Sequence, residues 1–144
     1  MNKYSELRRR QQAEINALPI GFAFGDKQFY ALMKGWGLDP EKDLDKIYRA
    51  GDTGGFFKKE DGQLIRDTLT RHDAELQAAI EEDKTGDGFI YQMFVAELAD
   101  HEYGYTEEAD ETLDALGYTW EQVTADKRLM RGLEMAQKRL LGGR

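Results

Sequence analysis

Hydrophobic residues recur along most of the chain at intervals of three and four, the spacing of one buried face of an α-helix. The pattern is clearest over residues 63–82, where Ile65, Leu69, His72, Leu76 and Ile80 fall on one face. Similar patterns predict helices over 3–17, 26–36, 40–50, 89–102 and 106–116. Near the end of the chain, a capping box from Thr119 to Gln122 and a capping acid at Asp126 predict further helix starts.

Two short segments in the first half of the chain are predicted to be strands. Residues 20–24 (IGFAF) alternate, with Ile20, Phe22 and Phe24 on one side, and residues 56–59 (FFKK) lie between glycine turns. Residues 40–50 are predicted to be a helix instead, because Asp39-Pro40-Glu41 is a typical helix start. The fold class is therefore α+β and mainly helical, with about six helices and two short N-terminal strands in a single domain over residues 1–144.

Composition narrows the class of protein. The chain has 144 residues, 40% of them hydrophobic, which suits a folded domain with a real core. It has no cysteine, which excludes disulfides and thiolate metal sites. No apolar run approaches the length of a membrane span, and the N-terminus lacks the apolar region of a secretory signal, so we expect a cytoplasmic protein that does not bind membranes.

The net charge of −8 is unevenly distributed. Residues 1–72 carry a net charge of +2 and residues 127–144 a net charge of +5. Between them, residues 73–126 hold one lysine and sixteen acids, a net charge of −15. Such a field disfavours direct binding of nucleic acid or anionic lipid, and it favours cations or basic protein surfaces.

The acids are densest in residues 97–114, where eight carboxylates occur without any lysine or arginine between them. One interpretation is a surface that binds a basic protein partner, with DNA mimicry as a specific form in which carboxylates take the places of phosphates. The other is a solvated acidic face that only keeps the protein soluble. The residues expected to contact a partner are Glu102, Glu107, Glu108, Asp110, Glu111 and Asp114.

The segment DKTGDGFI at residues 83–90 resembles the start of a calcium loop. Such a loop needs a carboxylate at its twelfth position, and that position is Phe94. A turn explains the same residues, with Lys84 beside a helix C-terminus, Gly86 in the left-handed conformation and Asp87 capping the next helix. We therefore expect a turn between two helices rather than a calcium site.

The only two histidines of the chain lie on the two helices that this turn joins. His72 and His101 lie at similar numbers of residues from the turn. If the two helices pack antiparallel, these histidines therefore lie at similar heights along the helix axes, with Glu75 and Glu97 beside them. Two interpretations follow: each histidine is a hydrogen-bonded core residue, or the four side chains form a metal site.

Two functions from different classes remain. The first is a non-enzymatic interaction or accessory protein that uses the acidic segment. The second is a metal-binding or metal-dependent enzymatic domain centred on His72 and His101. No cofactor motif is present, since no Gly-Lys-Ser/Thr follows the glycines at 51–55. The oligomeric state and the partner stay open.

Several motifs resemble those of a family of uncharacterised small acidic bacterial proteins, some of them carried by phages and other mobile elements. The motifs are FAFGDKQF, KQFYALMKGWGL, GFIYQMF, ADHEYGYT and ETLDALGYTWEQV, and together they extend over most of the chain. The resemblance implies no activity, cofactor or catalytic residue, and it favours an accessory role over a metabolic one.

Overall fold

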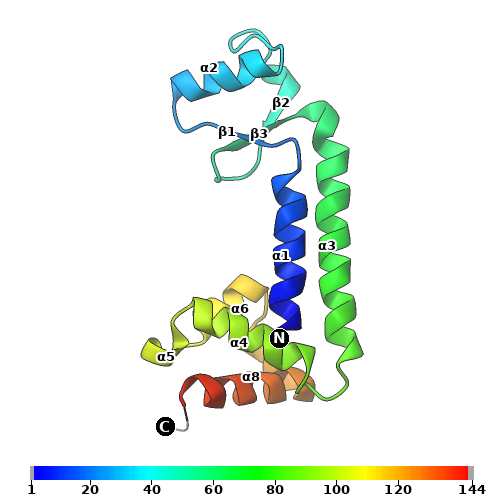
Figure 1. Ribbon diagram of the computed structural model, residues 1–144, viewed down its shortest axis with the longest axis vertical. Helices are drawn as coiled ribbons and strands as arrows, with labels where there is room; N and C mark the ends of the chain where they lie inside the picture. Colours follow the sequence, from blue (N-terminus) through cyan, green and yellow to red (C-terminus); the bar gives the residue numbers. More distant parts are fainter. Residues whose placement is uncertain (1, 143–144) are drawn as a thin grey trace. The chain divides into compact units, whose positions relative to one another are not determined.

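The computed structural model describes residues 2–142, and the chain divides into two compact units (Figure 1). Unit 1 consists of Met1–Gln11 and Asp73–Arg144, and unit 2 of Gln12–His72. Helices α1 (Lys3–Asn16) and α3 (Gly62–Glu82) each contribute residues to both units. Whether the units make up the single domain expected from the chain length stays a prediction.

The described residues confirm the predicted fold class, because they are mainly helical with one small antiparallel sheet in the N-terminal half. None of the helices in residues 2–142 combines the length and the apolar character that crossing a membrane requires.

Unit 2 is built around a three-stranded sheet in the order β1 (Gly21–Phe22), β3 (Gly55–Lys58), β2 (Ile47–Arg49). The predicted strands correspond to β1 and β3. The helix predicted over 40–50 is wrong, because one 3₁₀ turn (Leu44–Lys46) leads directly into β2. The Asp39 carboxylate does accept backbone N–H groups of the next residues, as at a helix start. Pairing of β2 with β3 then takes the backbone groups that a helix would have used.

One face of this sheet is covered by α2 (Asp26–Gly35). A Cβ atom at Gly21 would lie 2.2 Å from Leu32 Cδ1, so glycine at this position lets the Leu32 side chain pack directly on β1. Nearer the start of the helix, the ring centroids of Phe29 and Phe56 lie 5.1 Å apart. The alternation of each strand therefore leaves Phe22, Tyr48 and Phe57 on the opposite face.

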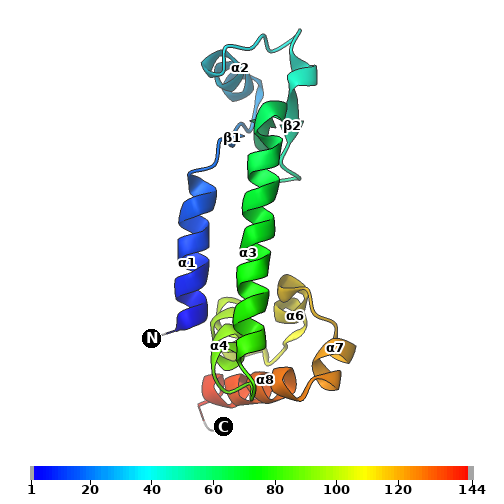
Figure 2. The same cartoon turned by 90° about the vertical axis from the view of Figure 1, so that its right-hand side faces the viewer.

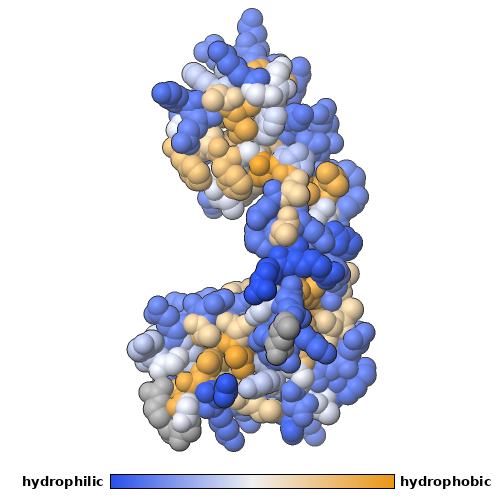
Figure 3. Space-filling view, viewed as in Figure 1, coloured by the Kyte–Doolittle hydropathy of each residue, from blue (hydrophilic) through white to orange (hydrophobic). Residues whose placement is uncertain are grey.

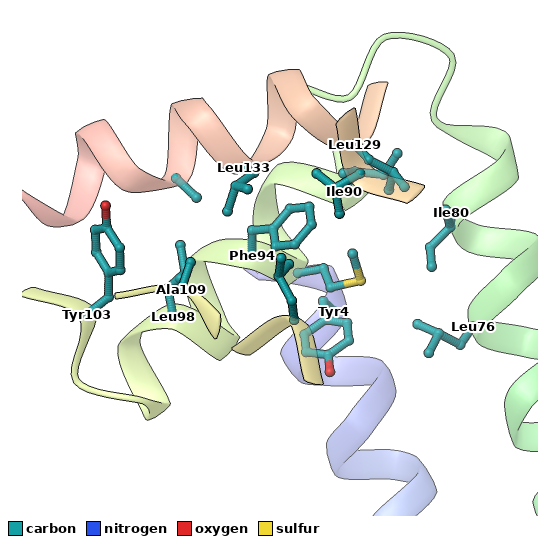
Figure 4. Packing of buried hydrophobic residues seen from close by; sticks show 14 residues of the cluster. Tyr4, Leu76, Ile80, Ile90, Phe94, Leu98, Tyr103, Ala109, Leu129 and Leu133 are labelled. Atoms are coloured by element: carbon teal, nitrogen blue, oxygen red, sulfur yellow. The ribbon is translucent and has the colours of Figure 1, made fainter. Parts of the chain in front are cut away.

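In unit 1, α4 (Phe89–Asp100) packs along α8 (Lys127–Leu140). Phe94 and Leu98 of α4 and Leu133 of α8 are inaccessible to solvent at the centre of this core, and Tyr4, Leu76 and other side chains close it (Figure 4).

The antiparallel packing of α4 on α3 that the short turn suggested is wrong, because α8 takes that place beside α4 (Figure 1).

The turn between α3 and α4 explains why α8 lies so close. Arg128 Nη1 donates to the carbonyl oxygens of Ile80 (3.1 Å) and Asp83 (2.9 Å), which holds the start of α8 under the turn. Gly86, at a φ of +95°, lies very close to the backbone of α8. A Cβ atom at this position would lie 2.1 Å from the Arg128 carbonyl oxygen. Gly132 is also constrained, with 2.8 Å between its ideal Cβ position and the Gly86 carbonyl oxygen.

The cap of α4 comes from a different acid than predicted. Asp83 Oδ2 accepts the backbone N–H groups of Gly88 (3.1 Å) and Ile90 (3.0 Å), and Oδ1 accepts those of Thr85 and Gly86. Asp87 instead pairs with the Thr85 hydroxyl and Arg131. Asp83 is the better placed residue because the turn folds back over its carboxylate. The prediction that Lys84 serves the end of α3 is confirmed, since its Nζ donates to a carbonyl there.

Three shorter helices connect α4 to α8: α5 (Tyr103–Thr106), α6 (Asp110–Leu116) and α7 (Trp120–Ala125), with α7 leading into α8 (Figure 2). The predicted capping box at the start of α7 is confirmed, as is the capping of α8 by Asp126. The helix predicted to begin at Thr106 begins only at Asp110, because residues 103–106 form a separate single turn.

Candidate functional site

The six acids expected to contact a partner lie in and around α5 and α6 of unit 1, and we call them the acidic surface. All six are exposed, and none forms an ion pair within the described part of the chain. Asp110 alone has a side-chain partner there, the indole N–H of Trp120 at 2.7 Å. The acidic surface consists of Glu102, Glu107, Glu108, Asp110, Glu111 and Asp114.

An aromatic side chain that the sequence analysis missed projects from this surface. Tyr105 is 91% exposed, the highest exposure of any large hydrophobic residue described. Two residues earlier, Tyr103 is buried among the core side chains beside α8 (Figure 4). The single turn of α5 thus anchors one tyrosine inward and presents the other outward.

The backbone at both ends of α5 is unusual. Glu102 and Glu107 each have a φ of 57°, and they are the only residues other than glycine with positive φ in residues 2–142. A side chain in the left-handed region costs about 1–2 kcal/mol per residue. The fold holds both against this cost, since Glu102 O accepts two backbone N–H groups and Glu107 N donates to Tyr103 O.

The residues of the predicted metal site are distributed over both units and have protein partners. In unit 2, buried His72 places Nε2 2.8 Å from Glu14 Oε2, so this nitrogen carries the proton when the glutamate is ionised. In unit 1, Glu75 forms an ion pair with Arg10 at 3.0 Å. Glu14, which lies 58 residues before His72, could not be connected with it by helical spacing alone.

The other two residues of that prediction join α4 to its neighbours within unit 1. Glu97 accepts the hydroxyl of buried Tyr4 at 2.5 Å, and half-buried His101 donates from Nδ1 to the Glu97 carbonyl oxygen at 2.7 Å. Both histidines are thus hydrogen-bonded to protein groups, as the core interpretation predicts. In residues 2–142 no three His, Cys, Asp or Glu side chains are grouped so that they could hold a metal ion. The metal site therefore stays a prediction, although α4 packs along α8 and not antiparallel to α3, as the derivation of that site assumed.

Ionisable groups in these contacts have perturbed pKa values. Hydrogen bonds from Arg71 and then His72 lower the pKa of Glu14 to about 2. Burial, together with the Glu97 carboxylate, raises the pKa of Tyr4 to about 12, although a hydrogen bond from Arg8 acts in the opposite direction. Burial also raises the pKa of Asp83, but its backbone donors outweigh this effect and the pKa lies below its usual range. The carboxylates of Glu14 and Asp83 therefore stay ionised at neutral pH.

Each unit contains a cavity large enough to consider as a binding site. The cavity in unit 1 has a volume of about 590 Å³ and lies between α1, α3 and the start of α4, with the Arg10–Glu75 ion pair in its wall. The cavity in unit 2, of about 450 Å³, lies between the start of α2 and strands β2 and β3. The latter could not be predicted, because its wall includes β2, which the sequence analysis took for a helix.

Comparison with known proteins gives a family but no activity. A family model described as "Family of unknown function (DUF7659)" matches residues 3–139, so the chain belongs to this family. No curated protein and no solved structure matches it significantly. The resemblance noted from the motifs is thus confirmed as far as a family of unknown function, while the bacterial origin and the association with mobile elements stay predictions.

Proposed function

We propose that this protein is an interaction module whose acidic surface, together with Tyr105 between Glu102 and Glu107 in the chain, binds a basic protein partner. The observation that carries the proposal is the contrast between Tyr103 and Tyr105, since one ring is buried and the other is 91% exposed among unpaired carboxylates. Exposed tyrosines surrounded by charged residues are typical of interface anchors.

The charges and the ring would contribute differently to binding. Carboxylates without internal ion pairs are free to meet Lys or Arg of a partner, and they raise the association rate through long-range attraction. The Tyr105 ring would bury its apolar area on binding and slow dissociation. The backbone hydrogen bonds of Glu102 and Glu107 would keep α5 in its conformation before a partner arrives, which reduces the ordering cost of association.

DNA mimicry is one specific form of this proposal. In that form the partner is a DNA-binding protein, and the carboxylates of the acidic surface occupy the positions of phosphates. Binding of the partner to this protein and to duplex DNA would then be mutually exclusive. Any other basic partner would bind both at once or would have no affinity for DNA.

The experiment begins with capture of partners from host lysate at low salt, followed by binding measurements between purified proteins. Reversal of Glu107, Glu108 and Glu111 to Lys should reduce the association rate strongly, and Tyr105→Ala should mainly raise the dissociation rate. A matched control reverses Glu6, Glu81 and Glu134, which are exposed acids of unit 1 outside the acidic surface. All variants should keep the circular dichroism spectrum of the unmodified protein.

The salt dependence provides a second criterion. The association rate should fall steeply up to 0.15 M salt, where the Debye length is about 8 Å. Unchanged binding after the reversal of Glu107, Glu108 and Glu111 would remove the acidic surface from the interface. An equal loss in the control set would show that only the overall charge matters.

A further inference from the structure

The cavity of unit 2 combines aromatic walls with two charged side chains. Its volume of about 450 Å³ lies within the range of small-molecule sites, which is ~300–1,000 Å³. Phe29 of α2 and Phe56 of β3 form one wall, with their ring centroids 5.1 Å apart and their planes tilted by 48°. Leu44, from the segment that leads into β2, lines it as well.

The apolar part of this wall is incompletely covered by the protein itself. Leu44 is 53% exposed, although it lines the cavity. Figure 3 shows hydrophobic side chains gathered over the part of the molecule formed by α2 and the sheet. A flat apolar group entering the cavity would bury area that is now in contact with water, which favours binding.

The two charged residues of the cavity have opposite signs, and neither has a charged partner among residues 2–142. Asp26 lies in the first turn of α2, and Arg49 ends β2 with its guanidinium 5.8 Å from the centre of the Phe56 ring. Neither side chain forms a hydrogen bond or ion pair with any residue from 2 to 142, whereas several other acids and bases of unit 2 do. A guanidinium on an aromatic face is well placed to receive a carboxylate in bidentate fashion.

We infer that this cavity binds a small zwitterion with an aromatic or large apolar side chain, of the amino-acid type. The ligand carboxylate meets Arg49, its ammonium group meets Asp26, and its side chain lies against Phe29 and Phe56. A purely apolar ligand would leave both charges unused. A monovalent anion would gain from Arg49 and be repelled by Asp26. A zwitterion with an apolar side chain therefore matches both the charged and the aromatic residues of the cavity wall.

The test is a titration of the ¹⁵N-labelled full chain, followed by NMR, with free phenylalanine, tyrosine, tryptophan, leucine and methionine. At least one should give saturable shifts at the backbone amides of residues 23–29 and 44–56. Phenethylamine and 3-phenylpropionate, which each lack one charge, should bind about tenfold or more weakly than phenylalanine, because each loses a charge-assisted hydrogen bond. Calorimetry provides the dissociation constants.

Two variants connect the binding to the charged residues. Arg49→Gln and Asp26→Asn should each weaken binding of the best ligand about tenfold or more. Lys27→Gln, an exposed neighbour outside the cavity wall, is the matched control and should not change it. The inference is overturned if none of the five amino acids gives saturable shifts at concentrations up to 10 mM (~10,000-fold weaker than a dissociation constant of 1 μM). It is also overturned if 3-phenylpropionate binds as well as phenylalanine, or if Arg49→Gln binds like the unmodified protein.

Discussion

The hydroxyl of Tyr4, near the start of α1, donates a 2.5 Å hydrogen bond to the carboxylate of Glu97 on α4. The two residues are 93 positions apart in the chain. Tyr4 is only 2% exposed and its ring packs edge-on against Phe89, so the bond lies at the boundary of the unit 1 core. It joins the first helix of the chain to the central helix of that unit.

Removal of this hydroxyl should destabilise unit 1. Tyr4→Phe keeps the ring but leaves the Glu97 carboxylate without its donor, and we expect a loss of about 1–3 kcal/mol in the free energy of unfolding. Tyr118→Phe is the control, because the half-buried Tyr118 hydroxyl has no hydrogen-bond partner in the described part of the chain, and its effect should stay within about 0.5 kcal/mol. Urea denaturation measures both, and equal effects would contradict the assignment.

The same tyrosine should make the protein sensitive to alkali. Its folded pKa of about 12 lies above the ordinary value of 10.0, so the unfolded chain loses this proton first. The stability that Tyr4 contributes is therefore fully present below pH 10.0 and is lost as the pH rises toward 12. Between these limits the unmodified protein should lose more stability than Tyr4→Phe does, as thermal unfolding followed by circular dichroism would show.

Glu14 should produce the opposite dependence at acid pH. Its pKa is about 2 in the folded chain against an ordinary 4.5, so its contribution is present above pH 4.5 and is lost as the pH falls toward 2. Glu14→Gln should lower the melting temperature at pH 7, and the difference from the unmodified protein should shrink in that acid range. Glu41→Gln, an exposed acid of unit 2, is the matched control. A difference that persists unchanged at the lowest pH would show that the charge of Glu14 is irrelevant.

Two glycine-to-alanine substitutions in helices should have opposite signs. Gly132 lies inside α8, where a Cβ atom would approach Ile90 Cγ2 to 2.6 Å, so Gly132→Ala should destabilise unit 1 by about 1–3 kcal/mol through overpacking. Gly35, the last residue of α2, has open space at its Cβ position, and Gly35→Ala should stabilise by about 0.4–1 kcal/mol. Stabilisation by both would mean that α8 and the 83–90 turn are farther apart than described.

Calcium at micromolar concentration should leave the melting temperature unchanged. The twelfth position of the supposed calcium loop is Phe94, which is 0% exposed, and the Asp83 oxygens already accept backbone N–H groups. Too few oxygens remain for an ion that takes six to eight. Calorimetric titration of EDTA-treated protein checks this, and a saturable signal with a micromolar dissociation constant would contradict it.

The candidate site was predicted in part. The exposure of all six acids followed from their position between the apolar residues of short helices, since charged side chains avoid the core. The role of Tyr105 did not follow, because Tyr103-Gly104-Tyr105 shows no periodicity that distinguishes an inward ring from an outward one. The antiparallel helix pair on which the histidine prediction depended also failed, because a short turn limits the distance between two helix ends but not their crossing direction.

The sequence by itself determined the positions of α2, α3, α4 and α8, the caps at Thr119 and Asp126, and the concentration of negative charge between residues 73 and 126. These features depend on groups within one helical turn of each other, so local spacing is enough to predict them. Only the tertiary structure decided that 47–49 is a strand, that α4 packs on α8, and that Glu14 meets His72. Each of these outcomes depends on partners distant in the chain, whose backbone and core contacts outweigh local preference.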